Sequence, residues 1–146
     1  MYSSKTLKEL DAKHSFFVGI DSDGCAFPSM ELKHKECFIP ETVRHFGLQP
    51  ISKYVREAAE FVNLYSKWRG ANRFPALLKV MDLLSTRNEV RRSGLHIPKL
   101  THLRSWIEQS TSLSNPKLVT AVKESNNSEL QQILAWSNAV NTAIEN

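Results

Sequence analysis

Cysteine and long apolar runs are both scarce in this chain. Only Cys25 and Cys37 occur among its 146 residues, and they do not have Cys-x-x-Cys spacing, which excludes a disulfide framework and a paired-cysteine zinc site. No apolar run approaches the roughly 20 residues of a membrane span, and residues 1–14 lack the apolar core of a signal peptide. We therefore expect a cytoplasmic protein with no membrane partner.

Dense runs of one charge are missing as well. The net charge of +4 permits an anionic partner, but the basic residues are spread along the chain and form no arm typical of nucleic-acid binding. We expect no nucleic-acid partner, and small phosphorylated molecules fit the charge at least as well. With 41% hydrophobic and 23% charged residues, the composition is that of an ordinary globular protein large enough for one core.

A short apolar run at residues 16–20 stops abruptly at Asp21, Asp23 and Gly24. Its apolar members are Phe16, Phe17, Val18 and Ile20. The length and the aromatic and β-branched content predict a buried strand, which would place both acids at its carboxyl end. Loops leaving strand ends form the ligand crevice of open α/β sheets, so both carboxylates are candidates to meet one cation or phosphate there.

Residues 16–25, Phe-Phe-Val-Gly-Ile-Asp-Ser-Asp-Gly-Cys, closely resemble the first motif of the haloacid dehalogenase-like (HAD) hydrolase superfamily. That motif is an apolar strand followed by Asp-x-Asp-Gly-Thr or Val, and Cys25 stands at its last position. The resemblance implies that Asp21 is the nucleophile forming an aspartyl-phosphate and that Asp23 is the general acid and base. An acid at the Asp23 position is typical of the superfamily's phosphatases and phosphomutases, so the implied substrate is a small phosphorylated metabolite.

The same resemblance implies a Mg²⁺ cofactor. In the superfamily the metal is held by the carboxylate at the Asp21 position, the backbone carbonyl at the Asp23 position and an acid from a later motif. A calcium loop beginning at Asp21 is excluded, because Cys25, Ala26 and Leu32 stand where an EF-hand needs an oxygen ligand, glycine and glutamate. A simple polar turn after a strand stays open as the alternative.

The resemblance also implies the architecture, an incomplete α/β HAD-like fold. Residues 1–40 would start the core with its first strand, catalytic loop and a two-stranded flap at 26–40, and residues 41–146 would form a mainly α-helical cap. On the flap, Lys33, His34 and Lys35 could contact a substrate, although a solvated hairpin surface is the simpler interpretation for each. Residues 6–14 are predicted to form a short helical or frayed segment before the strand.

Helical spacing dominates from residue 41 onward. We predict helices at 41–46, closed by Gly47, and at 51–68, 74–84 and 100–109. Two more helices are predicted to start at Asn115, as an N-cap before Pro116, and at Ser128, which opens a capping-box spacing. The apolar stripes comprise Ile51, Val55, Ala58, Val62 and Tyr65; Phe74, Leu77, Leu78, Met81 and Leu84; Leu103, Trp106 and Ile107; and Leu130, Ile133, Leu134, Val140 and Ile144.

Two arginines stand out in the segment 67–74, which links two predicted helices beside a glycine. Because arginine binds phosphate and carboxylate groups in a bidentate manner, Arg69 and Arg73 are our candidate substrate-binding residues of the cap. The alternative is an ordinary interhelix loop with surface arginines.

Later motifs of the superfamily are missing from the sequence. Beyond Asp21 and Asp23 the only aspartates are Asp11 and Asp82, with no Asp-Asp pair to complete a metal site. We therefore expect a fragment of a phosphohydrolase whose reading frame continues after Asn146, with little or no turnover by itself. The rival hypothesis is a small helical binding or interaction module without catalysis. The sequence does not indicate an oligomeric state.

Overall fold

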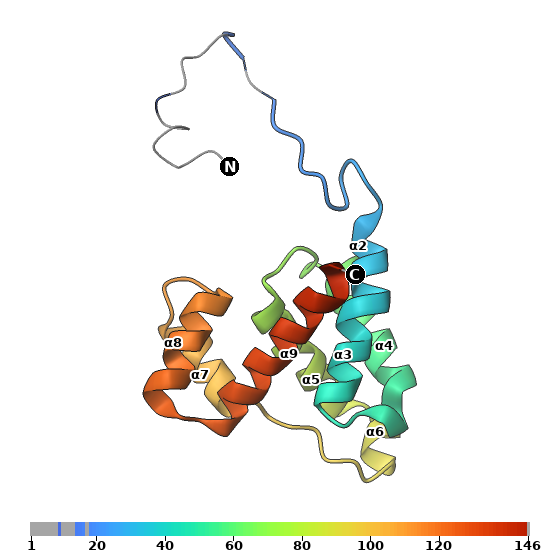
Figure 1. Ribbon diagram of the computed structural model, residues 1–146. Helices are drawn as coiled ribbons and strands as arrows, with labels where there is room; N and C mark the ends of the chain where they lie inside the picture. Colours follow the sequence, from blue (N-terminus) through green and yellow to red (C-terminus); the bar gives the residue numbers. More distant parts are fainter. Residues whose placement is uncertain (1–8, 10–13, 17, 146) are drawn as a thin grey trace.

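The computed structural model describes residues 9, 14–16 and 18–145 of the chain, which form a helical body with an N-terminal segment leaving it at one end (Figure 1). Within these residues there is no β-sheet, and the one strand-like feature is an isolated backbone pairing of Asp23 with Phe27. The predicted α/β fold class, with a core strand and a flap, is therefore wrong. The described chain is α-helical.

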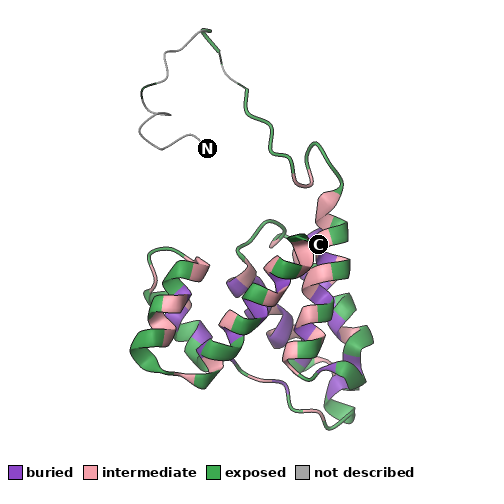
Figure 2. Ribbon diagram, in the orientation of Figure 1, coloured by how far each residue is buried: buried purple, intermediate pink, exposed green. Residues whose placement is uncertain are grey.

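The predicted strand is the first part of that error. Residues 16 and 18–20 have no regular secondary structure, and Phe16, Val18 and Ile20 are 89%, 81% and 76% exposed. Figure 2 shows this segment as exposed where it leaves the helical body. A strand needs backbone partners, and the described residues offer this segment none. Phe17 and most of the predicted lead-in at 6–14 lie outside the described residues.

The predicted flap is the second part of the error, because residues 29–45 form one continuous helical run. It comprises α2 (Ser29–Leu32), the π-helical turn η1 (Lys33–Phe38) and α3 (Ile39–His45). The side chains that turn inward, from Met30 through His34 to Phe38, recur every four residues, which is a helical period rather than the alternation of a hairpin. The division predicted at residue 40 falls inside this run and stays a prediction.

A π-helical turn at this place suits the local sequence. Pro40 has no N–H to donate, and its ring clashes with the carbonyl one regular helical turn earlier. The wider turn of η1 comes directly before this proline, in the way that π-bulges interrupt α-helices at positions of strain. Within this run Lys33 bonds to Asp23 of the N-terminal segment, and His34 is buried.

The predicted helices from residue 41 onward are confirmed, with adjusted ends. They correspond to α3, α4 (Ser52–Glu60) with η3 (Phe61–Tyr65), α5 (Arg73–Thr86), α7 (Thr101–Gln109), α8 (Asn115–Ser125) and α9 (Ser128–Glu145). Two short helices, η2 (Gln49–Ile51) and α6 (Asn88–Arg92), were not predicted. The predicted stripes are buried or half-buried with one exception, Tyr65, which is 62% exposed and donates to Glu31. Gly47 follows α3 with φ of +65°, as the helix-ending role requires.

Both predicted capping residues are wrong by one position. Asn115 is the first residue of α8 rather than its cap, and its side chain bonds to α9 instead, accepting from Ser137 at 2.7 Å. At α9 the cap is Asn127, whose Oδ1 accepts from the backbone N–H groups of Glu129 and Leu130 at 3.0 and 3.1 Å. Asparagine and serine are both favoured at N-caps, so the sequence pattern did not distinguish neighbouring positions.

Helix α9 crosses the middle of the body and packs against α3 (Figure 1). Trp136 of α9 is 2% exposed, and its indole N–H donates to the Thr42 hydroxyl at 3.1 Å. That hydroxyl in turn donates to the Phe38 carbonyl at 2.8 Å. The one hydroxyl thereby satisfies the buried indole and joins α9 to the η1–α3 run.

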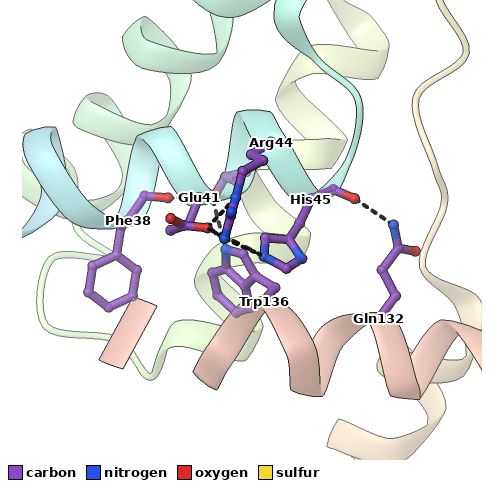
Figure 3. Close-up of polar contacts among 7 residues, drawn as sticks. Phe38, Glu41, Arg44, His45, Gln132 and Trp136 are labelled. Atoms are coloured by element: carbon purple, nitrogen blue, oxygen red, sulfur yellow. Dashed lines mark hydrogen bonds and ion pairs between the residues drawn. The ribbon is translucent and has the colours of Figure 1, made fainter. Parts of the chain in front are cut away.

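The outer side of this contact is polar (Figure 3). Glu41 accepts from Arg44 at 2.6 Å, and its carboxylate lies 3.3 Å from His45 Nε2. At the end of α3 the Gln132 side chain donates to the His45 carbonyl at 2.7 Å. The bond from Gln132 joins the C-terminal end of α3 to α9, while the Glu41 pairs lie within α3.

No helix in the described part of the chain is long and apolar enough to cross a membrane.

Thr42→Val tests the bond between α3 and α9. Valine has the shape of threonine but leaves the buried Trp136 N–H without an acceptor, so we expect the free energy of unfolding to fall by about 1–3 kcal/mol. Chemical denaturation measures the change. Thr120→Val is the matched control, because the exposed Thr120 hydroxyl makes a comparable bond to the Pro116 carbonyl. Equal losses in the two variants would contradict the role given to Thr42.

Candidate functional site

A cavity of about 710 Å³ lies where the N-terminal segment meets η1, the start of α5 and the end of α9. Asp21 and Asp23 line it together with Arg69 and Arg73. The four candidate catalytic and cap residues are therefore brought to one pocket, although they come from segments far apart along the chain. The pocket is also lined by Gly24, Cys25, Met30, Lys33, His34, Phe38, Asn63, Gly70, Ala71 and Ile144.

A compact turn, rather than a strand end, presents the two aspartates. The Ala26 N–H donates to the Asp21 carbonyl at 3.3 Å, and the Gly24 N–H donates to the Phe27 carbonyl at 2.8 Å. Gly24 has φ of +76°, a conformation that glycine adopts without strain. The local Asp-x-Asp-Gly sequence is thus sufficient to shape this turn without a sheet beneath it.

Asp23 is fixed by the start of the helical run. The Lys33 ammonium donates to Asp23 Oδ2 at 2.5 Å, and the Ser29 hydroxyl donates to Oδ1 at 2.7 Å. These bonds, that from Lys33 first, hold the pKa of the Asp23 carboxyl below its usual 3.8. Asp23 is therefore a carboxylate at neutral pH, with both oxygens engaged.

Arg69 reaches the turn from the other side of the pocket. Its Nη2 donates to the Gly24 carbonyl at 3.4 Å. A Cβ added at Gly24 would lie 3.2 Å from the same nitrogen and 2.7 Å from Met30 Cγ. The turn, α2 and the segment before α5 therefore approach too closely for any side chain at this position.

Arg73 is anchored on α9. Its Nη1 donates to the Ser137 carbonyl and hydroxyl, both at 3.1 Å, and to Asn141 Oδ1 at 2.7 Å. The guanidinium also lies over the Phe38 ring, 5.1 Å from its centre. All three bonded acceptors are uncharged, and no carboxylate in the described residues forms an ion pair with Arg73. Burial lowers the pKa of this guanidinium, which remains a cation at neutral pH.

His34 lies beside Arg73 and is 8% exposed. Its ring stacks on Phe38 with the centres 4.7 Å apart, and its Nδ1 is buried without a hydrogen-bond partner among the described residues. Burial, followed by the charge of Arg73, lowers the pKa of His34 from 6.5 to about 4. At neutral pH an uncharged imidazole therefore lines the pocket, with its Nδ1 enclosed.

The oxygen donors at the aspartate turn are of the type that binds magnesium. Mg²⁺ takes oxygen ligands, and one or two carboxylates completed by water and phosphate oxygens are common in proteins. Since Lys33 and Ser29 occupy the side chain of Asp23, the donors left are the Asp21 carboxylate and the Asp23 carbonyl. No group of three or more histidine, cysteine, aspartate or glutamate side chains within the described residues could hold a metal ion.

Sequence reasoning placed Lys33 and His34 on a flap surface and did not identify Asn63. The four-residue spacing from Met30 to His34 and Phe38 was the available signal for a helix that turns His34 inward. Asn63 gave a weaker signal, as a polar residue between the buried Val62 and Leu64. Lys35 does not line the pocket and pairs with Glu31 instead.

No protein-family model matches the chain, and no curated protein or solved structure shows significant similarity to it. The function of the pocket must therefore be inferred from its own chemistry and from the motif at residues 16–25.

Gly24→Ala tests the close approach at the turn. We expect the added methyl group to displace Met30 and Arg69, which changes the NMR signals of the Met30 methyl group and the Arg69 side chain. Gly94→Ala is the control, because Gly94 has a similar positive φ of +71° but open space around it. Unchanged Met30 and Arg69 signals in Gly24→Ala would show that the turn does not pack there.

The low pKa of His34 predicts a pH dependence of stability. The unfolded chain binds a proton at this imidazole near pH 6.5, whereas the folded chain does so only near pH 4. Between these values the unfolded state holds more protons, so the free energy of unfolding should fall as the pH is lowered from 6.5 toward 4, by about 1–3 kcal/mol.

Denaturation curves at several pH values between 4 and 7 measure this dependence. In His34→Phe the contribution of the imidazole should disappear, while the separate contribution of Asp23, whose pKa is also shifted, remains. An identical slope in the parent chain and His34→Phe would contradict the burial of a neutral His34.

Proposed function

We propose that the pocket binds the phosphoryl group of a small phosphorylated metabolite and that Asp21 and Asp23 serve phosphoryl transfer in a magnesium-dependent phosphohydrolase. The observation that carries this proposal is the shared pocket, in which both aspartates of the HAD-like motif meet Arg69, Arg73 and Lys33. Carboxylates and cations around one cavity are the arrangement that phosphoryl transfer requires, because the cations offset the repulsion between the substrate and the nucleophile.

Asp21 suits the role of nucleophile. Its side chain lines the cavity, and it stands at the position that the first HAD motif gives to the nucleophile. In the proposed reaction a carboxylate oxygen of Asp21 bonds to phosphorus, and the ester bond from phosphorus to the leaving oxygen breaks. Water then attacks the aspartyl-phosphate, which releases inorganic phosphate and restores the carboxylate.

Asp23 suits the role of base in the second step. Lys33 and Ser29 stabilise it as a carboxylate, so it can accept a proton from the attacking water. To protonate the leaving group in the first step, Asp23 must gain a proton, which the bond from Lys33 opposes. We therefore expect Lys33 to turn toward the phosphoryl oxygens when the substrate binds.

A bound Mg²⁺ would supply charge neutralisation at the phosphoryl oxygens, with the Asp21 carboxylate and the Asp23 carbonyl as its protein ligands. Arg69 lies next to the same turn and is placed to bind a phosphoryl oxygen. The described residues place no third acidic side chain there, so binding is a more suitable readout than turnover.

A second candidate function is that of a helical interaction module. Its supporting observation is the apolar N-terminal segment, in which Phe16, Val18 and Ile20 remain exposed beside a helical body. An exposed apolar segment of this kind is a common way to add a strand to the sheet edge of another protein. On this alternative the acidic turn has no chemical role and the pocket does not discriminate phosphate.

Binding of beryllium fluoride separates the two candidates. BeF₃⁻ with Mg²⁺ mimics an aspartyl-phosphate on a reactive carboxylate, and ¹⁹F NMR detects the bound form directly. We expect a bound signal that requires Mg²⁺ and is lost in Asp21→Asn. Asp82→Asn is the matched control, because Asp82 pairs with Arg104 on the surface of α5 and does not line the pocket.

Two results would contradict the proposed function. One is the absence of any bound ¹⁹F signal in the parent chain with Mg²⁺ present, with far-ultraviolet circular dichroism confirming a folded helical protein. The other is a bound signal that persists in Asp21→Asn, which would place the acceptor carboxylate elsewhere.

A further inference from the structure

The pocket has two cationic ends with different surroundings. At the outer end Arg69 contacts Gly24, and Lys33 contacts Asp23, so both cations belong to the aspartate turn. At the inner end Arg73 is held by Ser137 and Asn141 of α9 and has no contact with the turn among the described residues. A phosphoryl group that reacts with Asp21 must lie at the outer end. The inner end is then free for another part of the same substrate.

Arg73 lines the cavity and has unused hydrogen-bonding capacity. All of its described bonds are made by Nη1, and no described residue accepts from Nε or Nη2. Burying a cation without a counter-ion is unfavourable unless a ligand or water completes its hydrogen bonds. Arg73 also lines a small void among core residues such as Trp136 and Leu77, which is too small for a ligand, so a ligand can reach Arg73 only from the large pocket.

His34 lies at the same end of the pocket as Arg73. It is nine-tenths buried, lines the pocket and keeps Nδ1 without a partner in the described residues. A neutral imidazole can carry its proton on either ring nitrogen. Nδ1 is enclosed, whereas Nε2 is not enclosed and has no hydrogen-bond partner among the described residues, so Nε2 can donate to an anion that Arg73 binds.

We infer that Arg73 and His34 form a second anion subsite, which binds the carboxylate of a phosphorylated carboxylic acid whose phosphoryl group lies at the aspartate turn. This inference rests on the proposed function for the position of the phosphoryl group. It goes further by naming the substrate class, which the acidic turn alone does not determine.

The charge of the subsite favours a carboxylate over the other common groups. One guanidinium beside a neutral imidazole carries a single positive charge, which matches a carboxylate and leaves a second phosphate dianion under-neutralised. The planar fork of arginine also matches the two oxygens of a carboxylate. A neutral hydroxyl group would leave the cation without a counter-ion.

Non-hydrolysable phosphonates test the inference without turnover. The probes are phosphonoacetate, 3-phosphonopropionate and 4-phosphonobutyrate, each compared with the alkylphosphonate of the same length that lacks the carboxylate. Isothermal titration calorimetry with Mg²⁺ present gives the affinities. We expect at least one phosphonocarboxylate to bind about tenfold more tightly than its matched alkylphosphonate.

Variants locate the source of that gain. Arg73→Gln should reduce the tenfold gain, which is the ratio of the two affinities measured in the same variant, to within about twofold. Because Arg73 also joins α5 to α9, His34→Phe serves as a second variant that breaks no described hydrogen bond, and it should reduce the gain about threefold. The control is Arg91→Gln, since Arg91 donates to the Ser85 carbonyl on the surface, and it should keep the full gain.

The outcomes distinguish this inference from the proposed function. If alkylphosphonates bind and no phosphonocarboxylate of any length binds more tightly, the inference of a carboxylate subsite is wrong, and the proposed phosphoryl site is retained. If the gain is present but survives in both Arg73→Gln and His34→Phe, the subsite is assigned to the wrong residues and the inference is overturned. If neither series binds to the folded chain, the inference and the proposed function both fail.

Discussion

The pocket depends on the anchoring of Arg73 to helix α9. Three neutral oxygens of Ser137 and Asn141 accept from one nitrogen of its guanidinium, which fixes the start of α5 against the last turns of α9. The segment before α5 thereby takes a defined path and carries Arg69 to the aspartate turn. Because neutral acceptors anchor the guanidinium, its charge is not cancelled by the protein and remains available to a ligand.

The two ends of the pocket carry different chemical groups. At the turn, Lys33 neutralises Asp23, and the Asp21 carboxylate stands at the edge of the cavity as a reactive oxygen donor. At the inner end a cation and a neutral imidazole provide only hydrogen-bond donors to an anion. A ligand that spans the pocket must therefore present a group for metal-assisted chemistry at one end and an acceptor at the other. This polarity links the proposed phosphoryl chemistry to a particular class of substrate.

The sequence predicted most of the helices correctly, but it predicted the wrong structure for residues 16–40. Helical stripes such as Phe74 to Leu84 were predicted correctly because burial of one face follows directly from their spacing. The strand at 16–20 was wrong, because a strand depends on partners that no local pattern reveals, and the described residues form no sheet. The flap was wrong because short polar and apolar alternation in residues 31–38 concealed the helical spacing of Met30, His34 and Phe38.

The central claim is that one pocket gathers the aspartate turn, Arg69 and the Arg73–His34 pair around a phosphorylated ligand. The most direct measurement is a titration of the ¹⁵N-labelled chain with 3-phosphonopropionate and Mg²⁺, followed by NMR with side-chain arginine and histidine signals assigned. We predict that saturable shifts will be confined to the pocket, namely Asp21, Asp23, Gly24, Lys33, His34, Asn63, Arg69 and Arg73. Shifts spread over the surface lysines and arginines without saturation, or confined to another face of the helical body, would contradict the account.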